Sequence, residues 1–506
     1  MMNPKKLAIT TAVVLGVMFA RQVSVSAQEP AKHHHYKLVV VGTLGGPNSF
    51  LSGPEQQTLN NQGTFVAFAN TATPNPNPGC FVPFNSPDCF VERPVVLHNG
   101  KLTEMAVLPG GVNGQTDLIT GTGLVAGWSE NGLIDPLTGL PESRAVLWTL
   151  GGKVIDLGTV AGGTESLAVA ANDLGQVVGF SNNDVPDPFS IVGSPTQTRA
   201  FLWQNGAMKD LGTLGGTDAI AGYVNEAGQI AGAAYTNSDF STNCSFPLTT
   251  HAFFWENGKM VDLGTFGGSC SNIGWMNNSG QIVGYANTPD ENNHAFVWNK
   301  KGGLKNLGEL PEGSYSMAEW INEAGEIVGG SDGGTFFHAV LWKSGAVIDL
   351  GTVYGETCSE AYSINSGGQI VGYASADCSN EDHAFLAENG AIVDVNTLII
   401  GDASVTVVNA FDINDQGEIA GWGPVPSGDL RAVLLIPCDE NHPGIEGCDY
   451  NLVDSATTAE VHREEITKAP EVTSQPRLSP AELMARFRSL QAGRNHRFGA
   501  PQTSPQ

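Results

Sequence analysis

The chain is poor in basic residues. Lys and Arg together number 24 against 51 Asp and Glu, which gives the 506 residues a formal net charge of -27 at pH 7. A chain of that charge repels phosphate backbones and anionic lipid surfaces, so neither nucleic acid nor a membrane surface is a favourable partner. The same charge suits a protein that stays dissolved outside the cell.

Long hydrophobic runs are also missing. The longest covers residues 7–20, which is too short for a helix that spans a bilayer. Two lysines precede this run, and the small residues Val25, Ser26 and Ala27 follow it. This order of basic, apolar and small residues is typical of a signal peptide. We therefore predict a signal peptide over residues 1–27, a disordered leader over residues 28–35, and a secreted or periplasmic protein.

Motifs for catalysis, cofactors and metals are lacking as well. The chain contains no G-x-S-x-G, H-E-x-x-H or EF-hand spacing, and no Lys-Ser/Thr follows its Gly-Gly pairs as a phosphate-binding loop requires. No C-x-x-C pair supports a zinc site. The sequence predicts no catalytic residue, no cofactor and no metal, and it favours a protein that is not an enzyme.

What the chain has in abundance is repetition. An apolar run ending in D-L-G or a close variant restarts every 43 to 54 residues between Asp156 and Asp394, a period typical of propeller blades. Each unit adds a strand of small residues ending in Asn, then Q/E-I-V-G-Y, then H/R-A-F-L-W, which are four short strand candidates. Asn-x-x-Gly separates the small-residue strand from the next and predicts a tight hairpin turn.

The two ends of the repeat array complete each other. The array begins with a D-L-G-type strand at residues 37–46 and ends with an H-A-F-type strand at residues 431–436. We therefore predict an all-β protein, a β-propeller of about eight four-stranded blades over residues 36–437, closed by pairing of its N- and C-terminal strands. An open β-solenoid is the alternative. Seven blades also stay possible, because residues 119–121 depart from the repeat pattern.

The character of the chain changes after the repeats. We predict a disulfide loop over residues 438–450 and a flexible linker over 451–478, where Thr, Pro and Glu dominate. Residues 479–506 begin with Ser-Pro, which is favourable for the start of a helix, and carry several arginines. This segment is predicted to be a short basic helix and tail.

The motifs H-A-F-x-W and D-L-G-T-L-G-G, repeated over roughly residues 36–437, resemble those of the HAF-repeat family of bacterial extracellular proteins. The resemblance implies an extracellular location and a repeat architecture. The resemblance implies no catalytic residue in this chain.

A candidate binding face follows from the expected strand order. With the D-L-G strand outermost, the strand rich in Ala, Ser and Gly lies nearest the crowded axis. The D-L-G-T-L-G-G turns and the loops before H-A-F then share one face, and these loops vary most in length, as binding loops do. The candidate contacts on it are Phe189, Phe240, Phe246, Phe336 and Phe337. We expect an extracellular binding, adhesion or scaffolding module for a glycan or protein; the alternative is a propeller-type polysaccharide hydrolase or lyase with paired carboxylates at the axis.

One basic residue precedes each H-A-F-type strand. A ring of His suggests metal or anion binding, but His and Arg interchange among the units, which a metal site would not tolerate. We therefore predict a structural ring whose members bond the Asp of D-L-G. Its members are Arg93, Arg144, Arg199, His251, His294, His338, His383 and Arg431.

Eight cysteines in an exported chain predict disulfides, with zinc ligation as the alternative. Two pairs are close enough in sequence to bond locally. The other four occupy two equivalent repeat positions, which the expected strand order brings to one face. The predicted pairs are Cys80–Cys89, Cys244–Cys270, Cys358–Cys378 and Cys438–Cys448.

Overall fold

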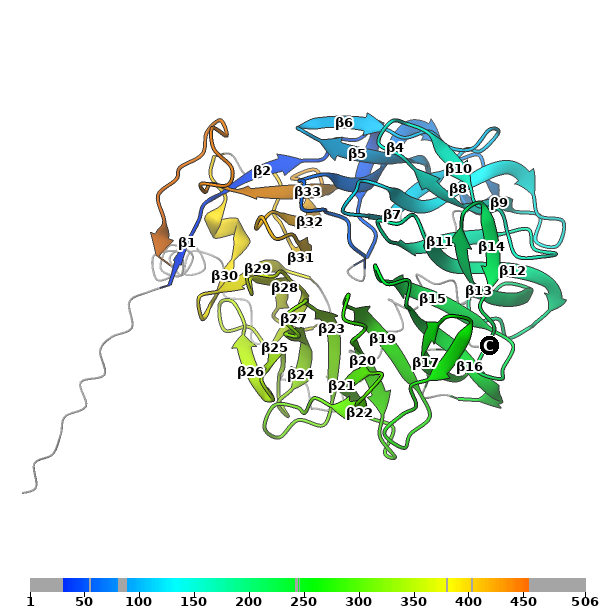
Figure 1. Ribbon diagram of the computed structural model, residues 1–506. Helices are drawn as coiled ribbons and strands as arrows, with labels where there is room; N and C mark the ends of the chain where they lie inside the picture. The colour runs from blue at the N-terminus through cyan, green and yellow to red at the C-terminus, as the bar shows by residue number, and fades with distance from the viewer. Residues whose placement is uncertain are drawn as a thin grey trace, which may run out of the picture.

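The computed structural model describes residues 31–53, 56–80, 89–241, 244, 246–378, 381–401 and 404–454. The predicted signal peptide, the predicted basic helix and most of the predicted linker lie outside these residues. The described chain forms eight antiparallel blades of four strands around a central axis (Figure 1). The predicted β-propeller is therefore confirmed.

The blades are numbered along the chain, so that blade 1 holds β3–β6 and blade 8 holds β31–β33 with β2. The innermost strands are β3 (Gly45–Phe50), β7 (Gly114–Ile119), β11 (Ser166–Ala171), β15 (Ala219–Val224), β19 (Ser271–Met276), β23 (Ser316–Ile321), β27 (Cys358–Ile364) and β31 (Asn409–Ile413). The second strands are β4 (Phe65–Pro74), β8 (Val125–Ile134), β12 (Val177–Pro186), β16 (Ile230–Phe240), β20 (Ile282–Asn287), β24 (Ile327–Asp332), β28 (Ile370–Ser375) and β32 (Ile419–Pro424).

The third strands, which carry the H-A-F-type motif, are β5 (Phe90–His98), β9 (Pro141–Trp148), β13 (Thr196–Gln204), β17 (Leu248–Glu256), β21 (Asn293–Asn299), β25 (Phe337–Lys343), β29 (His383–Glu388) and β33 (Leu430–Pro437). The outermost strands are β6 (Lys101–Glu104), β10 (Val154–Asp156), β14 (Ala207–Asp210), β18 (Lys259–Asp262), β22 (Gly303–Asn306), β26 (Ala346–Gly351), β30 (Ala391–Asp394) and β2 (Tyr36–Val40). Two short 3-10 turns, η1 (Pro78–Cys80) and η2 (Val395–Leu398), complete the described elements of the propeller.

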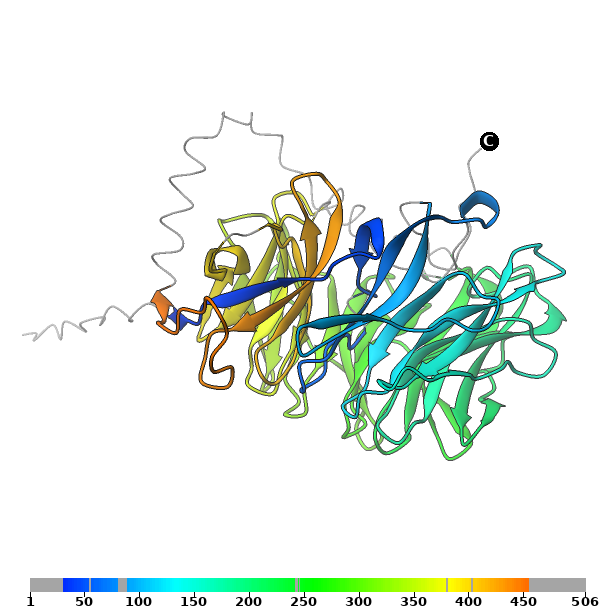
Figure 2. The same cartoon turned by 90° about the horizontal axis from the view of Figure 1, so that it is seen from above.

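Blade 8 closes the ring by joining the two ends of the chain. Strand β2 pairs antiparallel with β33, with Leu38 opposite Leu435, and the N–H of Val41 donates to the carbonyl of Ala432 at 2.9 Å. Figure 2 shows the blue N-terminal strand beside the orange C-terminal one. The predicted closure is confirmed, and it leaves no blade with an unpaired terminal strand among the described residues.

A second contact between the ends contradicts the prediction of a disordered leader. Strand β1 (Lys32–His33) pairs with β34 (Val453–Asp454), so the leader from residue 31 onward and the first residues of the predicted linker are held together. His33 is fully buried, and its Nδ1 lies 2.8 Å from Oε1 of Glu388 in blade 7. Composition suggested a solvated segment, but this histidine has a carboxylate partner and a strand neighbour.

The Asn-x-x-Gly turns bond the blades to one another. In blade 6, Oδ1 of Asn322 accepts the N–H groups of Ala324 and Glu326, which shapes its own turn. Its Nδ2 donates to the carbonyl of Asn365 in blade 7 at 3.1 Å. The same bond to the next blade is made by the turn residues Asn60, Asn172, Asn225, Asn277, Asn322, Asn365 and Asn414.

Blade 2 has Thr120 at this position, and a hydroxyl cannot reproduce the amide bond to Asn172 of blade 3. Replacing Thr120 by Asn is expected to complete the ring and to raise the free energy of unfolding by about 1 kcal/mol, the net contribution of one buried hydrogen bond. Guanidinium unfolding measures this. Thr120→Ala is the control, and a Thr120→Asn variant no more stable than the wild type would contradict the role of the ring.

All four predicted disulfides are present: Cys80–Cys89, Cys244–Cys270, Cys358–Cys378 and Cys438–Cys448. The middle two tie long loops to the turns between blades, and in the chain-entropy model each contributes about 3 kcal/mol. Four disulfides indicate a protein of an oxidising compartment, extracellular or periplasmic. None of the helices in the described parts of the chain has the length and hydropathy that crossing a membrane requires.

Candidate functional site

The strand order within the blades is as predicted. Ala168, Ala219 and Ala318 lie on innermost strands, and each D-L-G-type run forms an outermost strand. The variable loops before the H-A-F strands are extended hairpins in blades 1 to 4, where the second strands have ten or eleven residues. These hairpins lie on the predicted binding face, here called the loop face.

The five candidate phenylalanines have different environments. Phe189 and Phe240 are exposed on neighbouring hairpins and contact each other edge to face, with ring centroids 4.6 Å apart. Phe336 is half-buried against the ring of His338. The prediction was wrong for Phe246 and Phe337, which are buried in small clusters beneath the loops. Phe337 begins β25, and strand alternation turns it inward while Phe336 points out.

The predicted bond to the Asp of D-L-G is made by four of the eight members of the basic ring. These four pairs are Arg199–Asp210, His251–Asp262, His338–Asp349 and His383–Asp394, at 2.8 to 3.1 Å. The other four use other acceptors: Arg93–Glu104, Arg144–Glu142, His294–Glu309 and Arg431 with the carbonyl of Pro47. These bonds lower the carboxyl pKa of Asp262, Asp349 and Asp394, while burial acts in the opposite direction. The ring therefore fastens third strands to their surroundings.

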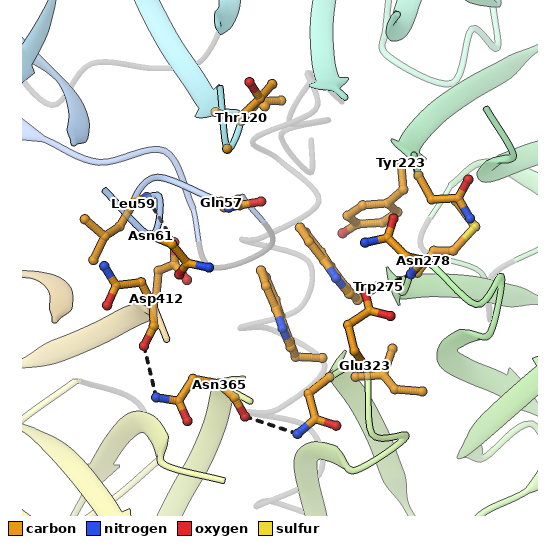
Figure 3. A pocket seen from close by; sticks show the side chains of 18 of the residues that line it. Gln57, Leu59, Asn61, Thr120, Tyr223, Trp275, Asn278, Glu323, Asn365 and Asp412 are labelled. Carbon is orange, nitrogen blue, oxygen red and sulfur yellow. Dashed lines mark hydrogen bonds between the residues drawn. The ribbon is translucent and has the colours of Figure 1, made fainter. Parts of the chain in front are cut away.

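A cavity of about 290 Å³ lies on the axis, at the opposite end of the innermost strands from the loop face. Its mouth is formed by the Asn-x-x-Gly turns (Figure 3). Part of its wall comes from blade 1, whose chain between β3 and β4 runs along the axis. There the carbonyl of Gln57 accepts the N–H of Ile119 in blade 2, while the N–H groups of Thr58 and Leu59 bond Asp412 in blade 8.

In blades 2 to 8, one position of the innermost strand forms a layer of side chains at this cavity. It lies two residues before the Asn of the turn, and a β-bulge precedes it in blades 2 to 8. A bulge re-aims the side chain that follows it. The residues at this position, from blade 2 to blade 8, are Leu118, Ala170, Tyr223, Trp275, Trp320, Ser363 and Asp412; all of them line the cavity except Ser363, which is buried and bonds Asp412.

The layer is aromatic on one side and polar on the other. Trp275 and Trp320 stack with centroids 3.6 Å apart, and Tyr223 contacts Trp275 edge to face at 4.7 Å. These three rings, here called the aromatic stack, come from blades 4 to 6. Asp412 lies across the cavity from Tyr223 and Trp275 (Figure 3). The cavity is therefore lined by aromatic rings on one side, of which Tyr223 and Trp320 are largely buried, and by the buried carboxyl of Asp412 on the other.

Carboxylates and amides surround the mouth. Oε1 of Glu226 accepts the N–H of Asp173 in the preceding blade at 2.9 Å, and Oε1 of Glu323 accepts the N–H of Asn278 at the same distance. Asp415 accepts the N–H of Ser366 in the same way. The turn of each of these blades thereby fixes the orientation of a carboxylate at the rim.

Asp412 is the buried carboxyl of the site. Burial raises its pKa to about 7, although hydrogen bonds from the N–H groups of Leu59 and Thr58 act in the opposite direction. A carboxyl whose pKa is higher in the folded than in the unfolded chain stabilises the fold at low pH. That contribution is lost as the pH rises through about 7.

Replacing Asp412 by Asn keeps an oxygen for the two N–H groups and removes the titration. The variant is expected to unfold less readily than the wild type at pH 8.5, by on the order of 1 kcal/mol, and to lose this advantage by pH 5. Guanidinium unfolding at both pH values measures the difference. A constant difference between the variant and the wild type at both pH values would show that Asp412 does not titrate in this range.

Sequence reasoning placed a site at the axis only in the enzyme alternative, and it missed the aromatic side of this cavity. It treated the small-residue strand as axial filling and placed binding on the loop face. The available signal was the position two residues before the turn Asn, where the repeats read Y-V-N, W-M-N and W-I-N in place of small or polar residues. The sequence did not show that bulges turn these particular side chains to the axis.

No protein-family model matches the chain, and no curated protein matches its sequence. Among solved structures, a puromycin-hydrolyzing peptidase of Mycobacterium tuberculosis is similar over 78% of this chain and 62% of its own, with 11% identity and a TM-score of 0.41. The β-propeller domain of the Trilobed protease from Pyrococcus furiosus is similar over 71% and 95%, with 10% identity and a TM-score of 0.38. The SapL1 lectin, solved with alpha methyl fucoside, is similar over 60% and 96%, with 14% identity and a TM-score of 0.28. The chain thus spans less than two thirds of the first peptidase, and these likenesses concern the fold alone.

Proposed function

We propose that the protein is an exported carbohydrate-binding module of the HAF-repeat kind, and that the axial cavity holds the sugar. The observation that carries this proposal is the aromatic stack of Tyr223, Trp275 and Trp320 in a cavity with a polar rim. In this proposal the signal peptide of residues 1–27 directs export, after which the disulfides form.

A saccharide ring has apolar C–H surface on its faces and hydroxyls around its edge. Ligand sites combine aromatic surface with a few fixed polar groups for this kind of ligand. Here the aromatic stack supplies the first, and the amides and carboxylates of Asn61, Asn278 and Glu323 supply the second. The volume of about 290 Å³ suits one or two sugar rings.

The alternative is a polysaccharide hydrolase or lyase, which requires carboxylates that are available for proton transfer. The carboxylate of Asp412 already accepts two backbone N–H groups, and the rim carboxylates hold the N–H groups of neighbouring turns. Because these carboxylates are held by backbone hydrogen bonds, the site favours binding over catalysis.

The loop face is a second candidate site, for a protein partner. Eleven large hydrophobic side chains are exposed among the described residues, and six of them lie at the tips of three neighbouring hairpins. These six are Leu133, Ile134, Leu137, Val185, Phe189 and Phe240. A gathering of exposed apolar side chains is typical of a protein-interaction surface.

A glycan array probed with the mature chain (residues 28–506) tests the proposal and separates the two sites. We expect saccharide binding that free saccharide displaces and that the double variant Phe189→Ser, Phe240→Ser retains. Loss of binding in that variant would move the glycan site to the loop face. A folded protein that binds no saccharide on the array would overturn the proposal.

A further inference from the structure

We infer that the axial cavity selects saccharides that carry a free ammonium group, that is, amino sugars without N-acylation. This inference rests on the proposed function and names the class of ligand. It follows from the charge of the cavity, from the way its carboxylates are held, and from its aromatic surface.

The charge of the cavity has one sign. Four carboxyl groups line it: those of Glu226, Glu323 and Asp415 are exposed at the rim, whereas that of Asp412 is buried, with its pKa raised to about 7 by burial, and adds little charge at pH 6. The lining residues that the structure describes include no Lys, Arg or His. An anionic sugar would therefore meet only like charge there, whereas a cationic group would find several partners.

The rim carboxylates are oriented before any ligand arrives. Glu226 and Glu323 each commit Oε1 to a backbone N–H of the preceding blade. Oε2 of each accepts no hydrogen bond from the described residues, and both side chains are exposed at the mouth. An ammonium group on a bound sugar can thus donate hydrogen bonds to carboxylates that lose little freedom on binding.

The aromatic stack favours the same ligand. The faces of Trp and Tyr rings attract a cation through their negative π surface, and they also pack against the C–H face of a sugar. A protonated amino sugar satisfies both the aromatic stack and the carboxylates. A neutral sugar uses only the stacking surface and the hydroxyl contacts.

Isothermal titration at pH 6 with three trimers tests the inference: glucosamine with free amines, N-acetylglucosamine, and galacturonic acid. We expect the glucosamine trimer to bind at least 10-fold more tightly than the N-acetylated trimer, and the galacturonic acid trimer not to bind. Salt should reduce the difference between the first two, because screening weakens charge pairing at an exposed rim.

The double variant Glu226→Gln, Glu323→Gln keeps an oxygen for each backbone N–H. It should lose most of the preference for the free amine while it still binds the N-acetylated trimer. The matched control is Glu440→Gln, Glu446→Gln, which removes two exposed carboxylates from the disulfide loop outside the cavity. This control should keep the full preference.

Two outcomes would overturn the inference and are distinguishable from each other. Equal affinity for the glucosamine and N-acetylglucosamine trimers would show a sugar site without charge selection, and the proposed function would stand. Failure of all three trimers, together with an empty glycan array, would remove the proposed function as well.

Discussion

Replacing Trp275 by Ala is expected to weaken binding of the glucosamine trimer about 30-fold, or about 2 kcal/mol, as for an aromatic residue at the centre of a binding site. Trp275 is the middle ring of the aromatic stack and contacts both Tyr223 and Trp320. Its removal takes away ring surface and also frees the two neighbouring rings to move. Titration calorimetry against the wild type measures the loss.

The matched control is Trp203→Ala. Trp203 lies on β13 and packs against the hydrophobic cluster of blades 2 to 4, away from the cavity. The Trp203→Ala variant should lower the free energy of unfolding about as much as Trp275→Ala does and leave the affinity for the trimer unchanged. If both variants bound the trimer as the wild type does, the aromatic stack would be a packing feature alone.

Replacing Val41 by Pro is expected to lower the free energy of unfolding by more than about 3 kcal/mol, because proline removes a backbone N–H and restricts the residue before it. The N–H of Val41 donates to Ala432 at 2.9 Å, where the first and last strands of the propeller meet. The substitution therefore weakens the joint that closes the ring. Guanidinium unfolding followed by tryptophan fluorescence measures the change.

Val41→Ala separates the hydrogen bond from the packing of the side chain, which is 1% exposed. The alanine variant loses buried surface but keeps the N–H, so it should cost about 1 to 2 kcal/mol. Equal losses in the alanine and proline variants would mean that the terminal joint contributes little to stability.

Repetition made most of the fold predictable. A motif that recurs with a constant order of strands identifies its own equivalents, so the innermost strands and the closing pair of strands follow from alignment of the chain with itself. Two of the four disulfides followed too, because their cysteines occupy equivalent places in the repeats: Cys270 and Cys358 lie in the same turn of their units, and Cys244 and Cys378 in the same loop. What repeats is therefore predicted well.

The candidate site depends on what does not repeat. The bulge recurs in blades 2 to 8, but the residue after it differs from blade to blade, and Trp275 and Trp320 stand there in blades 5 and 6. A bulge has no reliable mark in a single sequence. The environments of Phe246 and Phe337 likewise depend on how each loop folds over its blade. His33 finds its partner Glu388 at a distance of 355 residues along the chain, which local composition cannot predict.

The closure of blade 8 also determines how long the first strand of the propeller stays unpaired during synthesis. Leu38 and Leu435, which face each other across the joint, are 397 positions apart. At a synthesis rate of about 5 to 20 residues per second, β33 is made roughly 20 to 80 s after β2. Throughout that interval β2 is an unpaired strand that invites association with other chains. The pairing of β2 with β33 closes the finished propeller, but it also leaves β2 without a strand partner until β33 has been made.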